Sequence, residues 1–254
     1  MPAVPPSLRR PLVLVVGLLL VVAAVVVGVR LATGDDDEGR PVLLVYGYQG
    51  TTEQMEPLAD ALRAAGRNVT IVDLPDDNTG DLWDSAWRLG QAAEQAMADA
   101  DADSVDVVAH SAGGIVTRLW VSTAGADVAH RVVTLGSPHH GSDGAAVFDE
   151  CLEACQQLTP GSDLLDELAQ QDETPGAASW VSIWSANDGA VEPPESSELD
   201  GAVNLRLQDV CPGAEINHSQ LLSDPLPLAL AVAEVDADEP VEYGSGDCEQ
   251  LSGS

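Results

Sequence analysis

The part of the sequence with the clearest chemical content is centred on Ser111. Residues 109–113 read Ala-His-Ser-Ala-Gly and directly follow an apolar, β-branched run that begins at Val105. Small residues two positions before and two after a serine permit a sharp strand-to-helix turn, which presents the hydroxyl as a nucleophile. The commonest form of this motif has glycine where this chain has alanine, and the alternative is an ordinary glycine-rich turn. We interpret Ser111 as a nucleophile, with the backbone N–H of Ala112 available to an oxyanion.

The elements around this serine alternate between short apolar strands and amphipathic helices. Strands are expected at residues 42–46, 69–72, 105–109, 131–135, 180–184 and 203–207. Helices are expected at residues 53–65, 81–100, 113–123 and 219–234. This alternation predicts an α/β fold with a mostly parallel sheet flanked by helices. The glycine-rich segment 136–176, with a short helix at 163–170, interrupts the rhythm and is expected beside the active site.

Four sequence blocks allow a comparison with a known family. They are Val-Leu-Leu-Val-Tyr-Gly-Tyr at 42–48, the serine motif at 109–113, Thr-Leu-Gly-Ser-Pro-His-His-Gly at 134–141, and Ser-Ala-Asn-Asp-Gly-Ala-Val at 185–191, which is followed by His218. With these blocks, residues 41–235 resemble the small bacterial lipases and esterases of the α/β-hydrolase fold, similar to the class 2 triacylglycerol lipases. The relatives commonly carry His-Gly where this chain has Tyr46-Gly47. The resemblance implies an enzyme that hydrolyses carboxylic esters of small molecules or lipids without a cofactor or metal.

The other members of a catalytic triad are expected from their order, because this fold places Ser first, then Asp or Glu, then His. His218 is the last histidine and is our candidate general base, since His110 adjoins the nucleophile and cannot turn back to it. Asp188 follows the fifth expected strand and is our candidate acid, with Asp209 as the second choice. His130 precedes a strand, where we expect a solvated helix-end residue.

Two further features follow from the same blocks. The family pattern implies that the backbone N–H of Tyr48 is the second donor of the oxyanion hole, beside that of Ala112. His139 and His140 raise the alternative of a metal site, but adjacent side chains diverge and no completing carboxylates can be placed. We interpret both histidines as loop-packing or active-site rim residues.

Composition excludes several classes of function. The chain of 254 residues contains 42 acidic and 10 basic residues, a net charge of −32, and all ten basic residues are arginine. The absence of lysine excludes a P-loop lysine, a Schiff-base lysine and a Ser–Lys dyad. A surface this acidic repels phosphate backbones, so nucleic acid is not expected as a partner.

The N-terminus predicts a membrane helix. Residues 12–29 are apolar and follow Arg9 and Arg10, whereas residues 35–38 are all acidic. Eighteen helical residues span about 27 Å, close to the hydrocarbon thickness of a bilayer. The arginines favour a cytoplasmic N-terminus, which places the catalytic domain outside the cytoplasm. We expect an uncleaved single-pass anchor in the cell membrane, with secretion after signal cleavage as the alternative.

Cysteine usage agrees with export. An even set of four cysteines in an exported chain favours disulfides over zinc, for which neither a C-x-x-C pair nor nearby clustered histidines exist. Four cysteines can be connected in three ways. We expect the connectivity that consists of Cys151–Cys155 and Cys211–Cys248.

The expected organisation has five parts. They are a cytoplasmic N-terminus (1–10), a transmembrane signal anchor (11–31), an acidic linker (32–40), the hydrolase domain (41–235) and an irregular acidic tail (236–254). Two other functions stay open from the sequence: an acyltransferase on the same fold, which passes the acyl group to an alcohol, and a surface binding protein without catalysis.

Overall fold

A computed structural model describes residues 39–144 and 150–252 of the chain. These described residues belong to one compact unit. The expected anchor, cytoplasmic segment and most of the linker lie outside the described residues. Within the part that is described, no helix is both long and apolar enough to cross a bilayer.

The core of the described unit is a six-stranded parallel sheet with the order β2-β1-β3-β4-β5-β6. Its strands are β1 (Val42–Val45), β2 (Val69–Ile71), β3 (Val105–His110), β4 (Ala129–Leu135), β5 (Ser179–Trp184) and β6 (Val203–Arg206). All residues of β1 and β3 are buried. Because a parallel sheet is covered on both faces, its central strands are mostly apolar, apart from charged or polar residues such as Asp106 in β3 and Arg131 in β4. The expected α/β-hydrolase architecture is confirmed for these residues.

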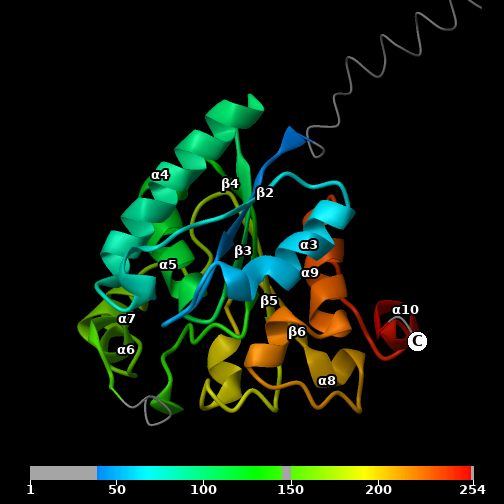
Figure 1. Ribbon diagram of the computed structural model, residues 1–254. Helices are drawn as coiled ribbons and strands as arrows, with labels where there is room; N and C mark the ends of the chain where they lie inside the picture. Colours follow the sequence, from blue (N-terminus) through cyan, green and yellow to red (C-terminus); the bar gives the residue numbers. More distant parts are fainter. Residues whose placement is uncertain (1–38, 145–149, 253–254) are drawn as a thin grey trace, which may run out of the picture. The chain divides into compact units, whose positions relative to one another are not determined.

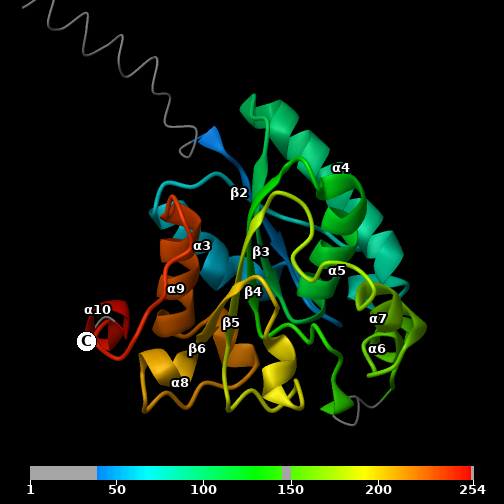
Figure 2. The same cartoon turned by 180° about the vertical axis from the view of Figure 1, so that it is seen from behind.

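Helices cover both faces of the sheet, with α4 and α5 on one face and α3 and α9 on the other (Figures 1 and 2). The α-helices are α3 (Glu56–Ala64), α4 (Leu82–Ala100), α5 (Ala112–Trp120), α6 (Glu153–Gln157), α7 (Asp163–Leu168), α8 (Leu207–Val210), α9 (Pro225–Asp236) and α10 (Cys248–Ser252). Shorter helical turns are η1 (Glu53–Met55), η2 (Pro75–Asn78), the π-turn η3 (Val121–Gly125), η5 (Pro194–Ser197) and η6 (Ser219–Leu222).

The ends of the helices follow from local chemistry. Asp81 caps α4 by accepting a hydrogen bond from the N–H of Trp83 at 3.0 Å. The continuous helix expected at 219–234 is instead η6 followed by α9. The break is caused by Asp224, which caps a new helix at the N–H of Leu226, and by Pro225 in the first turn.

The C-terminal tail differs from the expectation that it is irregular. It contains α10, whose first residue Cys248 forms a disulfide with Cys211, and Leu251 packs into the core. Cys151–Cys155 is the second disulfide, so both expected pairings are confirmed. The sequence pattern does not reveal α10, because a five-residue helix is too short to show periodicity and is fixed here by a covalent bond.

Buried charges hold the amino ends of the strands together. The carboxylate of Asp106 in β3 is fully buried and lies 2.6 Å from Nη2 of Arg67, 3.6 Å from Nη1 of Arg40 and 3.0 Å from Nδ1 of His130. We expected His130 to be a solvated residue at a helix end, and this expectation is wrong. His130 is a half-buried residue of β4 that binds the neighbouring strand. These contacts tie β1, β2, β3 and β4 at the sheet edge opposite Ser111.

A second buried pair joins β4 to α9. Nη1 of Arg131 lies 3.3 Å from Oε2 of Glu234, and neither side chain is more than 1% exposed. The carboxylate also accepts the N–H of Val241. Burial outweighs these contacts and raises the pKa of Glu234 to about 7.

We predict that Glu234 makes stability depend on pH between about 4.5 and 7. The folded state binds the Glu234 proton more tightly than the unfolded state, so the free energy of unfolding falls as pH rises through this range. Glu234→Gln removes that component. Urea unfolding of both proteins at a series of pH values measures the free energy of unfolding. The value for the wild type minus that for the variant should fall as pH rises, by up to about 3 kcal/mol at 1.36 kcal/mol per pKa unit. A difference that is constant or rises with pH would contradict the prediction.

Candidate active site

The backbone of Ser111 has an unusual conformation that presents its side chain. Its φ and ψ angles are 54° and −129°, which only glycine adopts without strain. Ser111 lies between the last residue of β3 and the first residue of α5, and its N–H donates to the carbonyl of Leu135 at 2.9 Å. The strand–turn–helix context expected for a nucleophile elbow is therefore present.

Glycines allow other segments to approach this turn. A Cβ on Gly47 would lie 2.6 Å from Cβ of Ser111, and a Cβ on Gly113 would collide with the carbonyl oxygen of Val45. The loop after β1 can therefore pack directly against the serine. Tyr48 follows in this loop, and Ala112 is the first residue of α5, whose N–H has no acceptor within the helix.

Asp188 and His218, the acid and the base expected from the sequence, are hydrogen-bonded to each other. Oδ2 of Asp188 lies 2.9 Å from Nδ1 of His218, and the carbonyl of Asp188 accepts the backbone N–H of His218 at 2.9 Å. The other carboxylate oxygen accepts the N–H groups of Ala190 and Val191 at 3.0 and 2.7 Å. With Nδ1–H donated to the carboxylate, the imidazole carries its lone pair on Nε2.

The electrostatics favour an ionised Asp188. Burial raises its pKa, but the hydrogen bond and charge of His218, together with the two backbone N–H groups, lower the pKa below its ordinary value. Asp209, the second choice for the acid, is exposed and lies 3.9 Å from Arg206. The structure therefore pairs His218 with Asp188 and leaves Asp209 at the surface.

His110 contacts His218 directly. The two rings are 4.6 Å apart, and Nε2 of His110 lies 3.2 Å from the carbonyl oxygen of His218. Burial, and then repulsion from His218, lower the pKa of His110 to about 3. His110 is thus neutral near pH 7, and its hydrogen bond positions the loop that carries His218.

The loop after β4 also contributes to the site. A Cβ on Gly136, whose φ is +55°, would lie 2.8 Å from Oδ2 of Asp188 and 3.3 Å from Nδ1 of His218. Only glycine fits here without disturbing the Asp188–His218 pair. Gly136 was not singled out from the sequence, because its role depends on the adjacency of β4 and β5, which one sequence does not reveal.

His139 and His140 do not share one site. His139 is buried, with Nε2 3.1 Å from Oγ1 of Thr134 and its carbonyl bonded to Arg118. His140 instead reaches outward to Glu173, with 2.7 Å between Nε2 and Oε1. Among the described residues, no group of three or more His, Cys, Asp or Glu side chains has a metal-binding arrangement. Both histidines hold the 134–141 loop in place.

Two cavities meet at Ser111 and His218. The smaller, about 40 Å³, has mainly apolar walls that include Pro138, Leu158 and Val191. The larger, about 300 Å³, is lined by polar residues, glycines and Leu222, and the surface it presents is also more apolar than polar. Tyr48, Ser111, Ala190 and His218 line both cavities. The serine and histidine therefore lie where two adjoining cavities meet.

Comparison with known proteins places this site in a family. The sequence model of the palmitoyl protein thioesterases matches residues 41–177, more than half of the chain, including Ser111. The chain belongs to the palmitoyl protein thioesterase family. The family assignment supports an ester hydrolase, and the expected likeness to α/β-hydrolase lipases and esterases is confirmed.

Solved structures agree on the fold. Lipase B of Aspergillus fumigatus matches with a TM-score of 0.74 and 21% identity, over 85% of this chain and 57% of that one. The mature lipase BlEst2 of Bacillus licheniformis matches with a TM-score of 0.66 and 18% identity, over 77% and 91% of the two chains. An α/β hydrolase from a lagoon-sediment metagenome, MGS-MChE2, has a TM-score of 0.55 at 17% identity, over 77% and 90%. The chain thus spans little more than half of the Aspergillus lipase, and these likenesses show the fold alone.

We predict that Gly136→Ala inactivates the protein while leaving it folded. The new Cβ meets Asp188 and His218 and displaces the imidazole, so hydrolysis of p-nitrophenyl butyrate should fall at least about 100-fold. Gly66→Ala is the matched control, since Gly66 has φ +92° and nothing within 4 Å of an added Cβ. Both variants should lose about 1 kcal/mol of stability from the positive φ, and Gly136→Ala should lose more, because its Cβ also lies 2.5 Å from Cδ1 of the buried Leu221. Equal activity in the two variants would show that Gly136 has no special relation to the pair.

Proposed function

We propose that the protein hydrolyses carboxylic esters through an acyl-enzyme on Ser111, with His218 as general base and Asp188 as its orienting acid. The observation that carries the proposal is the 2.9 Å Asp188–His218 hydrogen bond beside two cavities that both contain the strained serine. The family match, which spans the Ser111 motif, supports the same reaction class.

The reaction follows from these positions. Oγ of Ser111 attacks the ester carbonyl while Nε2 of His218 takes its proton, and Asp188 stabilises the imidazolium that forms. The backbone N–H groups of Ala112 and Tyr48 stabilise the oxyanion. The protonated His218 then donates to the departing alcohol. Water, activated by the same imidazole, releases the acid and restores Ser111.

Each of the two cavities can hold one half of an ester substrate. The apolar walls of the smaller cavity suit the acyl chain, and the larger cavity, which includes Gln49, Gln54 and Ser219, suits the alcohol. A space of about 40 Å³ holds roughly three water-sized groups, so short acyl chains are favoured. The net charge of −32 favours uncharged esters and thioesters over polyanionic ones.

We also propose that the protein works outside the cytoplasm and is held to the cell membrane by residues 12–29. The apolar segment with arginines before it and acidic residues after it supports this orientation. The two disulfides support an oxidising compartment. N-terminal sequencing of the mature protein distinguishes a retained anchor from a cleaved secretion signal.

We predict that the full chain hydrolyses p-nitrophenyl butyrate faster than p-nitrophenyl palmitate and that Ser111→Ala reduces kcat/KM at least about 1000-fold. Asp188→Asn should cost about 100- to 10,000-fold, because the imidazole loses its fixed tautomer. Asp209→Asn is the matched control and should retain activity, since its carboxylate is exposed. Steady-state rates of the four proteins test the proposal, and undiminished turnover in Ser111→Ala would refute it.

Product analysis separates the related activities. With an uncharged butyryl thioester in place of the oxyester, the assay measures thioesterase activity at the same serine. With an added primary alcohol, formation of a new ester instead of free butyrate would identify an acyltransferase. Inactivity of a folded wild type toward all of these substrates would favour a binding protein without catalysis.

A further inference from the structure

One hydroxyl joins the loop after β1 to the chain on both sides of Cys151. The hydroxyl of Tyr48 donates to the carbonyl of Glu150 at 3.0 Å and accepts the N–H of Leu152 at 3.1 Å. The two partners are more than 100 residues from Tyr48 in the sequence, so this contact is a tertiary constraint. It uses the phenol both as donor and as acceptor.

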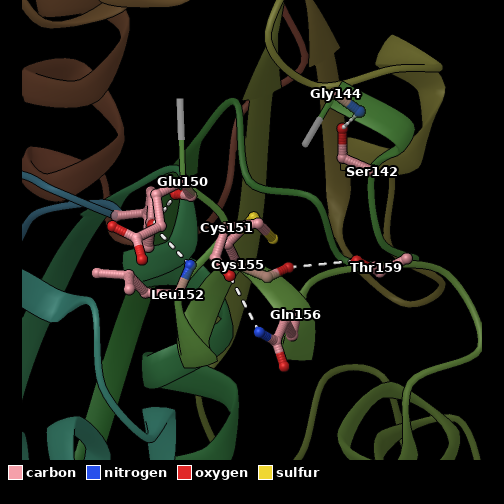
Figure 3. The surroundings of a disulfide bond; sticks show 9 residues. Ser142, Gly144, Glu150, Cys151, Leu152, Cys155, Gln156 and Thr159 are labelled. Atoms are coloured by element: carbon pink, nitrogen blue, oxygen red, sulfur yellow. Dashed lines mark hydrogen bonds between the residues drawn. A yellow bond between two sulfur atoms is a disulfide. The ribbon is translucent and has the colours of Figure 1, made fainter. Parts of the chain in front are cut away.

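The chain that Tyr48 contacts is closed by a disulfide. Cys151 and Cys155 are four residues apart, with Cα atoms 5.1 Å from each other. Further hydrogen bonds fix the loop that this disulfide closes. Nε2 of Gln156 donates to the carbonyl of Cys151, and Oγ1 of Thr159 donates to the carbonyl of Cys155 (Figure 3). The disulfide therefore fixes the main chain at Glu150–Leu152 to the first turn of α6.

Helix α6 is itself anchored to the body of the domain. The side chain of Gln157 accepts the N–H of Leu82 at 2.8 Å and donates to the carboxylate of Asp81 at 2.8 Å. The N–H of Ala154 donates to the carbonyl of Thr79. A continuous set of contacts thus runs from the start of α4 through α6 and the disulfide to Tyr48.

This set of contacts ends in the walls of the active site. Cys155, only 4% exposed, and Leu158 line the smaller cavity together with Ser111 and His218. Tyr48 lines both cavities. One half of the disulfide, Cys155, and the tyrosine bonded to the chain around its other half are therefore both residues that a bound acyl chain would touch.

We propose that the Tyr48 hydroxyl and the Cys151–Cys155 disulfide act together as a clamp, which positions the Tyr48 backbone N–H for the oxyanion and fixes the wall of the acyl cavity. The proposal rests on the proposed ester hydrolysis at Ser111. Tyr48, through its side chain, and both cysteines are positioning residues in this arrangement. Removal of the Tyr48 hydroxyl releases the loop after β1 from the chain at residues 150–152, and removal of the disulfide releases that chain from α6. Both changes break the connection between the loop and α6, and they therefore lower kcat by the same route.

The test is a double-mutant cycle between Tyr48→Phe and Cys151→Ser/Cys155→Ser in the full chain. Phenylalanine keeps the ring and the backbone N–H and removes only the hydroxyl. Each change should lower kcat for p-nitrophenyl butyrate roughly tenfold, because a displaced oxyanion donor weakens transition-state binding. The combined variant should lose little more than either alone, since coupled residues are non-additive. The ratio of palmitate to butyrate kcat/KM should rise about threefold as the wall loosens.

The chain offers two matched controls. The hydroxyl of Tyr46 donates to the carbonyl of Leu74 at 3.1 Å and accepts its N–H at 2.8 Å, the same bonding pattern as Tyr48 but outside both cavities. Tyr46→Phe should lower the melting temperature and leave the palmitate-to-butyrate ratio of kcat/KM unchanged. Its effect on kcat should be additive with that of Cys151→Ser/Cys155→Ser. Cys211→Ser/Cys248→Ser removes the other disulfide and should behave in the same way.

The outcomes separate the clamp from the reaction that it serves. An active wild type in which the Tyr48 and cysteine effects on kcat simply add, with an unchanged acyl ratio, overturns the clamp and leaves the proposed function standing. The clamp is equally overturned if removal of either disulfide changes the melting temperature and kcat to the same extent. A wild type that hydrolyses no ester overturns the proposed function and the clamp together.

Discussion

The strained backbone of Ser111 is the constraint on which the rest of the active site depends. A serine at φ 54° is held there by its position between β3 and α5, where its N–H bonds the neighbouring strand and its carbonyl accepts the N–H of Gly114. The strain persists because many surrounding contacts determine it. Those contacts require close approach of the chain, which explains Gly47 in the loop after β1 and Gly113 in α5. A side chain at either glycine would occupy space already taken by the turn or by β1.

The parallel sheet then brings the remaining groups to the serine. Because all six strands run in the same direction, their carboxyl ends lie along one edge, where ligands bind in open α/β sheets. Tyr48, Ser111, Gly136 and Asp188 each follow the end of a different strand and meet at this edge. The opposite edge collects charges instead, around the buried carboxylate of Asp106. The sheet therefore separates residues that bind strands together from residues that are available to a substrate.

The sequence offered candidates for the parts of the site that have local signatures. Ser111 was predicted from the small residues around it, and Asp188 and His218 from their order after it; the structure places Asp188 and His218 in hydrogen-bond contact. The strand positions followed from short, mostly apolar and β-branched runs, because burial on both faces of a parallel sheet leaves that pattern in the chain. The two disulfide pairings were also within reach, since one cysteine pair is local and only one partner remains for each of the others.

Features that depend on tertiary proximity were outside that reach. The role of Gly136 requires the adjacency of β4 and β5, and that of the Tyr48 hydroxyl requires Glu150 and Leu152, more than 100 residues away. The expectation for His130 was wrong for the same reason, because its partner Asp106 is on a neighbouring strand. These residues share a physical character: each is an ordinary residue type whose function is to fit or hold a neighbour. Sequence chemistry identifies groups that react, whereas groups that position them become visible only when the chain is folded.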